Sequence, residues 1–211
     1  MGRYKATAIS RRLKKSVGEQ TFYLLNGQNI VRMKNEENSS NTPAQALQRR
    51  LFTALGDLGW LFEDAAAIGF PARPRKHSPH NAFMKANAGV VKADEGGEVT
   101  VDYAAINCSN GRLELPKKLS VTLNSENNTL TFVHPAENFG RNRKGSDRLY
   151  AVLLEKELKE TVLLELNHRS DSEPVVVTID EEWQGENLCV YVFVLTEKGK
   201  RASMTKFIQI A

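Results

Sequence analysis

The sequence predicts an α+β protein, in which an N-terminal β-hairpin and two helices precede an antiparallel β-sandwich. Three observations support this prediction: a turn signal between two apolar runs at 20–34, a helical apolar stripe that begins near Pro43, and alternating apolar residues from about residue 118. We therefore expect a hairpin and helical module at 1–92, a connecting segment with one strand at 93–117, and a β-sandwich module at 118–211.

The hairpin prediction rests on the stretch "QTFYLLNGQNIVRMK". Its Asn26-Gly27 pair is the residue combination that a two-residue type I′ turn favours, because both central positions need positive φ. A two-stranded hairpin is marginal in water by itself. We therefore expect its apolar side chains to pack on the helix that follows in the chain.

A long helix should begin at Pro43. Thr42 is a suitable N-cap, proline suits the first helical position, and Gln45 completes a capping box. The apolar residues that follow are spaced by three or four positions, which makes one continuous stripe typical of a core-facing helix. Its members are Leu47, Leu51, Leu55, Leu58, Phe62 and Ala65, widened by Phe52 and Leu61.

A second, shorter helix is predicted from about Pro79 to Ala88, with Ser78 as its N-cap. His77 and His80 stand at a spacing that could form half of a metal site. No Cys, Asp or Glu lies within ten residues on either side, and the neighbouring arginines and lysines would repel a cation. We therefore predict neither a metal site nor a cofactor.

Beyond residue 98 the apolar period changes from helical to alternating. Eight segments separated by polar turns are predicted as strands: Val99 to Tyr103, Lys118 to Leu123, Thr129 to His134, Arg148 to Glu155, Thr161 to Leu166, Pro174 to Ile179, Leu188 to Thr196 and Ala202 to Ile210. The run "LCVYVFVL" is apolar at every position, which predicts a central strand covered on both faces. The last strand carries lysines and suits a sheet edge.

Composition is that of a folded soluble protein, and the charge is unevenly divided. The chain has a net charge of +4, but residues 1–85 hold 14 Lys/Arg and 6 Asp/Glu, whereas 86–211 hold 15 and 19. No apolar segment is long enough to span a bilayer and the N-terminus does not resemble a secretory signal, so we expect a cytoplasmic protein. Cys108 and Cys189 are interpreted as two buried or half-buried thiols.

Five stretches together resemble a Bacteroidetes family of about this length that has no assigned function: "VGEQTFYLLNGQNIVRMK", "NTPAQALQRR", "HNAFMKAN", "VDYAAINCSNGRLELP" and "GENLCVYVFVLTEKGKRAS". The resemblance covers nearly the whole chain and implies no activity. One departure is His134, where the family often has an aromatic residue, usually Trp. The strands from Lys118 onward are similar in order and spacing to a fibronectin type III sandwich, which implies a binding module by analogy.

A search for catalytic motifs favours a non-enzymatic protein. The sequence has no nucleophile elbow, phosphate loop, dinucleotide fingerprint or H-E-x-x-H motif. "EKGKRAS" at 197–203 lacks the upstream glycine of a phosphate loop and is interpreted as a hairpin turn. The run Asp180-Glu181-Glu182 is interpreted as a solvated turn, not as a cation site.

The candidate binding site lies in loops that an immunoglobulin-like sandwich would gather at one end, namely 135–147, 167–173 and 196–200. Seven cationic or potentially cationic side chains and one aromatic would meet there and receive an anionic partner. The alternative is that such residues are simply what exposed turns contain. The predicted contact residues are Phe139, Arg141, Arg143, Lys144, His168, Arg169, Lys198 and Lys200.

A second basic segment lies in the N-terminal arm, where Arg11, Arg12, Lys14 and Lys15 could contact phosphates without sequence preference. Our main hypothesis is a non-enzymatic interaction or structural protein that binds a protein or other acidic partner through the loops of the sandwich. The alternatives are a nucleic-acid-binding protein that uses its basic N-terminal half, or a self-assembling subunit of a phage-like or secretion assembly.

Overall fold

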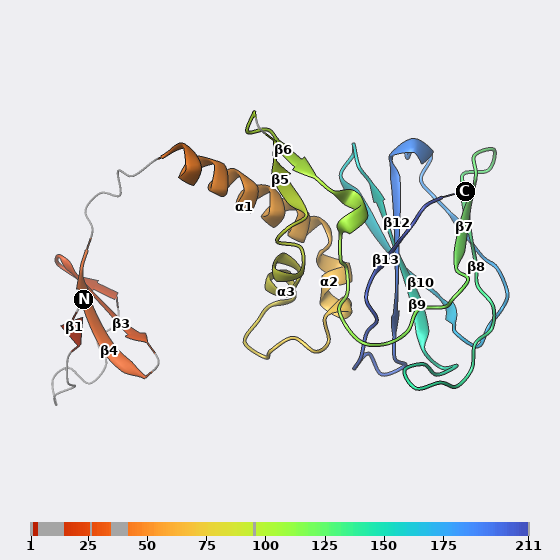
Figure 1. The fold of residues 1–211 in the computed structure, drawn as a ribbon, viewed down its shortest axis with the longest axis horizontal. Helices are drawn as coiled ribbons and strands as arrows, with labels where there is room; N and C mark the ends of the chain where they lie inside the picture. The colour runs from red at the N-terminus through yellow and green to blue at the C-terminus, as the bar shows by residue number, and fades with distance from the viewer. Residues whose placement is uncertain (1, 4–14, 26, 35–41, 95, 211) are drawn as a thin grey trace. The chain divides into compact units, whose positions relative to one another are not determined.

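The computed structural model describes residues 2–3, 15–25, 27–34, 42–94 and 96–210. The chain divides into two compact units, Met1–Pro43 and Ala44–Ala211 (Figure 1). The boundaries expected at 92 and 117 lie inside the second unit. The physical reason is that its helices pack against β-strands from the C-terminal part of the chain in a common hydrophobic core.

The first unit is a four-stranded antiparallel sheet with the strand order β1-β4-β3-β2. Strands β3 and β4 pair so that Tyr23 lies opposite Ile30 and Leu25 opposite Gln28. Gly27 has a φ of 81°, a value that glycine adopts without a steric penalty, and Asn26 lies outside the described residues. Two short strands that the sequence did not predict extend the sheet beyond a hairpin. The bounds are Gly2–Arg3 for β1, Lys15–Val17 for β2, Gln20–Leu25 for β3 and Gln28–Met33 for β4.

Three helices open the second unit: α1 (Pro43–Leu61), α2 (Glu63–Gly69) and α3 (Pro79–Ala86). The predicted start of α1 at Pro43 is confirmed. The predicted cap of α3 is also confirmed, because the Ser78 hydroxyl accepts a hydrogen bond of 3.1 Å from the Asn81 N–H. The stripe expected to be one helix is divided at Phe62, although helical hydrogen bonds continue across the division.

The strands of the second unit form three antiparallel sheets, with the orders β10-β9-β12-β13, β11-β8-β7 and β5-β6. Two single-turn 3₁₀ helices, Tyr103–Ala105 and Gly185–Asn187, lie in the connections. The strand bounds are Val91–Ala93 for β5, Val99–Val101 for β6, Ser120–Asn124 for β7, Thr129–Val133 for β8, Arg148–Glu155 for β9, Glu160–His168 for β10, Val175–Thr178 for β11, Leu188–Leu195 for β12 and Lys206–Ile208 for β13.

Two hydrophobic cores lie on opposite faces of the four-stranded sheet. One face of β9 and β12 packs with the three helices, and the other packs with strands β7 and β8 of the three-stranded sheet. The second unit is therefore layered as helices, four-stranded sheet and three-stranded sheet, an arrangement visible in Figure 1. These layers, with antiparallel strands and separate helices, define an α+β fold.

Strand β12 lies at the centre of this arrangement, and all eight of its side chains are buried. The prediction of a central strand covered on both faces is confirmed. Strand β9 has the predicted bounds, whereas β13 is shorter than the predicted strand from Ala202 to Ile210. Ala202 instead forms an isolated bridge with Leu195, and Ser203 forms another with Leu113.

The helical stripe packs on the sheet of its own unit. The Phe62 ring stacks on Phe83 of α3 with centroids 5.5 Å apart and meets the edge of Tyr191 on β12 at 5.6 Å. The first half of the stripe is only partly buried. Phe52, which we expected to widen the stripe, is 64% exposed because it lies on the outer face of α1.

Candidate functional site

The loops predicted to meet at one end of the sheets do come together. The Glu137 N–H donates to the Arg169 carbonyl at 2.9 Å, and the Arg169 N–H donates to the Asp147 carbonyl at 2.8 Å. Arg201, the residue directly after the third loop, donates from its guanidinium to Asn142 Oδ1 of the first loop at 3.2 Å. Backbone hydrogen bonds thus join the first two loops, and one side-chain hydrogen bond joins the first loop to the end of the third.

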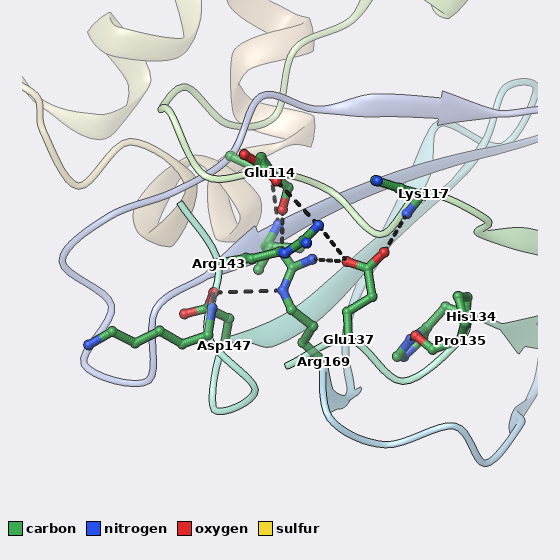
Figure 2. Close-up of polar contacts among 11 residues, drawn as sticks. Glu114, Lys117, His134, Pro135, Glu137, Arg143, Asp147 and Arg169 are labelled. Atoms are coloured by element: carbon green, nitrogen blue, oxygen red, sulfur yellow. Dashed lines mark hydrogen bonds and ion pairs between the residues drawn. The ribbon is translucent and has the colours of Figure 1, made fainter. Parts of the chain in front are cut away.

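Arg169, predicted to contact a partner, has no exposed surface. Its Nη1 donates to Glu137 Oε2 at 2.9 Å, its Nε lies 3.7 Å from Asp147 Oδ2, and its Nη2 donates to the Glu114 carbonyl. Figure 2 shows this guanidinium between the two carboxylates. Arg169 therefore holds the loops together from inside, and it is no longer a candidate for contact with a partner.

Arg143 is also engaged by carboxylates. Its Nη1 lies 3.5 Å from Glu114 and 3.9 Å from Glu137, and its side chain is about one quarter exposed. We call Glu114, Glu137, Arg143, Asp147 and Arg169 the arginine cluster (Figure 2). With three carboxylates and two guanidiniums, its formal charge is −1. The cluster thus cancels two of the positive charges that the sequence suggested for this end of the fold.

Two histidines near the cluster are also held by internal contacts. His168 Nδ1 lies 3.7 Å from Asp171 Oδ2. His134 is buried, and its ring nitrogens lie 3.1 Å from the Pro135 carbonyl and 2.8 Å from Asn167 Oδ1. Both neighbouring atoms are acceptor oxygens, so a neutral imidazole, which has a single N–H, donates to one of them.

The remaining predicted contact residues stay at the surface. Phe139 is 84% exposed, and the four remaining cations of the predicted loops are exposed as well. Among the described residues, none of these cations lies within ion-pair distance of a carboxylate. We call this set the tip surface; it consists of Phe139, Arg141, Lys144, Lys198 and Lys200.

The candidate phosphate contacts of the N-terminal arm are mostly outside the described residues, which applies to Arg11, Arg12 and Lys14. Lys15 is the first residue of β2. Its side chain is exposed, and its φ of 78° lies in the left-handed region, which is uncommon for lysine.

Nucleophilic and metal-ligating groups do not form a further site within the described part of the chain. Cys108 and Cys189 are both buried, and burial raises the pKa of each thiol, that of Cys108 strongly. Burial also raises the pKa of Tyr191, whose hydroxyl donates to the Tyr103 carbonyl at 2.7 Å. No group of three or more His, Cys, Asp or Glu side chains is placed to hold a metal ion in the described ranges.

A cavity of about 700 Å³ that sequence reasoning missed lies beside the third loop. Its lining combines residues from α3 and from three connecting segments of the second unit. The only signal in the sequence was the basic run after α2, which we considered solely as an obstacle to metal binding. We call this the basic cavity; its ionisable lining residues are Arg73, His77, Lys85, Arg112, Lys200 and Arg201.

Comparison of the chain with protein-family models, with curated proteins and with solved structures finds no match in any of the three. Of the helices in the described residues, none combines the length and apolar character that crossing a membrane requires.

Proposed function

We propose that the protein is a non-enzymatic interaction module whose tip surface binds an acidic protein partner. The observation that carries this proposal is an almost fully exposed phenylalanine in a loop that also carries two exposed cations, Arg141 and Lys144, without ion-pair partners in the described structure. Aromatic and arginine side chains are enriched at protein interfaces, because the ring buries apolar area while the guanidinium makes directional hydrogen bonds. A partner that offers carboxylates around an apolar pocket would match both features.

The proposed architecture of this module is fibronectin type III-like. Its support is the strand order: seven successive strands from β7 to β13 are divided into the sheets β11-β8-β7 and β10-β9-β12-β13, which share one core. Binding surfaces in sandwich folds are commonly built from loops that a rigid framework holds at one end. The arginine cluster supplies such rigidity here, since it fixes the base of the loop that presents Phe139.

The tip surface can be tested with a short fluorescein-labelled peptide of alternating Glu and Leu, measured by anisotropy at low and high salt. We expect the triple variant Arg141→Glu, Lys144→Glu and Lys198→Glu to weaken binding by about tenfold or more and to flatten the salt dependence. Phe139→Ala should weaken binding without changing the salt dependence. Lys92→Glu, Lys118→Glu and Lys159→Glu form a control with the same charge change on exposed lysines elsewhere.

Equal losses in the tip variant and the control would contradict the proposal, because binding would then follow net charge alone. A mobility-shift assay with random duplex DNA tests the alternative that the protein binds nucleic acid. Binding to DNA that is lost in Arg11→Glu and Arg12→Glu but kept in the tip variant would favour that alternative. Light scattering after size exclusion would reveal self-assembly.

A further inference from the structure

The basic cavity has a wall built from four segments of the second unit. Arg73 lies between α2 and α3, and Lys85 lies on α3. Arg112 lies at the end of the segment 106–112, which we call the Cys108 loop. Lys200 and Arg201 precede β13. Between these cations the lining is apolar or neutral, with Phe70, Pro74, four alanines, Asn110 and Gly111 among its members.

Internal hydrogen bonds fix the frame of this cavity. The Asn110 N–H donates to the Gly69 carbonyl at 3.0 Å, and the Leu113 N–H donates to the Ala202 carbonyl at 3.0 Å. Gly111 is required by close approach, because a Cβ atom there would lie 1.9 Å from the Ala202 oxygen. The walls are therefore held by contacts that do not depend on a ligand.

The same frame is tied to α3 and to the segment before β13. The buried Asn87 side chain exchanges hydrogen bonds with the backbone of Asn107, at 2.7 and 2.9 Å. The N–H groups of Cys108 and Ser109 both donate to the Thr205 hydroxyl at 2.8 Å. The cations of the cavity are thus carried by segments that are cross-linked to one another by polar contacts.

The charge of the cavity is not balanced by its own walls. Its lining holds five Lys/Arg side chains and one histidine but no carboxylate. Within the described residues, none of the five is close enough to an Asp or Glu to form an ion pair. The adjoining cavity, which shares Arg73 and Lys200, includes one carboxylate, that of Glu197.

Two of the guanidiniums are already oriented. Arg73 Nη1 donates to the Phe70 carbonyl at 3.0 Å, and Arg201 Nη2 donates to Asn142 Oδ1 at 3.2 Å. Each guanidinium has five N–H donors in a planar fork, so further donors remain for an anion. Oriented arginines around a cavity favour phosphate, whose oxygens accept paired hydrogen bonds from one guanidinium.

We propose that the basic cavity binds a small molecule that carries two or more phosphate groups. Its volume lies within the range of about 300–1,000 Å³ that is usual for small-molecule sites. The cations repel one another in the free protein, and one polyvalent anion would reduce this repulsion. The arrangement therefore favours a polyphosphate over a single phosphate. This proposal goes beyond the tip surface, with which the cavity shares only Lys200, and it does not depend on a protein partner.

Isothermal titration calorimetry of the full chain with sodium tripolyphosphate tests the proposal, with citrate and orthophosphate as comparison anions. We expect tripolyphosphate to bind at one site per chain and more tightly than either comparison anion at the same ionic strength. Arg73→Gln with Arg112→Gln should weaken it by about tenfold or more. Lys118→Gln with Lys159→Gln removes the same charge elsewhere on the surface and should leave the affinity unchanged.

Lys85→Gln provides a second variant, since this exposed lysine in the last turn of α3 can be changed without disturbing the frame. It should weaken tripolyphosphate binding while the protein unfolds at an unchanged temperature. The proposal is overturned if tripolyphosphate binds no more tightly than orthophosphate, if citrate binds equally well, or if the control pair loses as much affinity as the cavity pair. The tip variant Arg141→Glu, Lys144→Glu and Lys198→Glu must retain tripolyphosphate binding, so the two proposals can fail separately.

Discussion

Arg169 is an arginine, a residue type usually found at protein surfaces, but at this end of the fold it is buried and stabilises the loops. A buried guanidinium is tolerated only when carboxylates and carbonyl groups surround it, and here Glu137, Asp147 and the Glu114 carbonyl do so. Glu137 and Asp147 lie at the two ends of the loop before β9, and Glu114 lies in the connection before β7, so one side chain ties the loop base together.

We predict that Arg169→Ala lowers the free energy of unfolding by about 3–5 kcal/mol, because the change leaves Glu137 and the buried Asp147 without their partner. Urea denaturation followed by circular dichroism measures the loss. Arg141→Ala is the matched control, since that exposed arginine makes no ion pair with a described residue, and its effect should stay within about 0.5 kcal/mol.

Adding Glu137→Gln and Asp147→Asn to Arg169→Ala should recover part of the lost stability by removing the carboxylate charges that Arg169 balanced. A loss no larger than that of Arg141→Ala would show that the cluster contributes little to stability.

At the residue scale, the sequence indicated which loops meet but not which cations form ion pairs there. Glu137 and Asp147 lie in the same loops as the cations, yet counting the cations alone hid their pairing. The burial of Arg169 follows from the backbone bonds that bring 137, 147 and 169 together, and no local pattern reports such contacts. The basic cavity was missed for the same reason, because Arg73 and Arg112 become neighbours only through the packing of α2 against the Cys108 loop.

The junction between α2 and the loop at Cys108 is among the closest backbone approaches in the second unit. A Cβ atom at Gly69 would lie 2.0 Å from the Cys108 carbonyl oxygen and 3.1 Å from Ser109 Cα. Both are backbone atoms, so the contact cannot be relieved by turning a side chain.

We predict that Gly69→Ala lowers the free energy of unfolding by about 1–3 kcal/mol or more, because the helix end must move away from the loop. Gly56→Ala in α1 is the control, since a Cβ there meets no atom within 4 Å. This second helical change should raise stability by up to about 1 kcal/mol through helix propensity. Thermal unfolding of both variants makes the comparison, and a neutral Gly69→Ala would contradict so close an approach of the two backbones.

At the element scale, sequence periodicity predicted the long strands and the start of α1 well. The predicted bounds of β8, β9 and β12 differ from the observed bounds by at most one residue, because the apolar alternation or continuous apolar run of these strands is strong. Strands β2 and β5 were missed, since three residues are too few to show a period; β6 and β13 are equally short but lie inside longer stretches that were predicted as strands. The division at Phe62 was missed because the apolar stripe continues unchanged across it.

For the whole molecule, the division into two units predicts that the second can fold without the first. Both cores of the second unit consist of residues from Leu58 onward. We predict that a fragment comprising 44–211 unfolds cooperatively and has the tryptophan fluorescence of the full chain, since it contains both tryptophans, Trp60 and Trp183. A fragment comprising 44–199 is the control: it lacks Ala202 and Ile208, which are buried in the two cores, and should fail to fold. Non-cooperative unfolding of the longer fragment would contradict independent folding.

The complete burial of β12 also determines how the chain behaves when it is not folded. Eight uncharged, β-favouring residues without proline form the kind of segment that stacks into intermolecular cross-β ladders once it is exposed. Charged residues stand just outside it, with Glu186 before the strand and Glu197 and Lys198 after it, and such flanking charges oppose stacking between chains. The same side chains that join both cores in the native state are therefore the main aggregation hazard during synthesis and refolding.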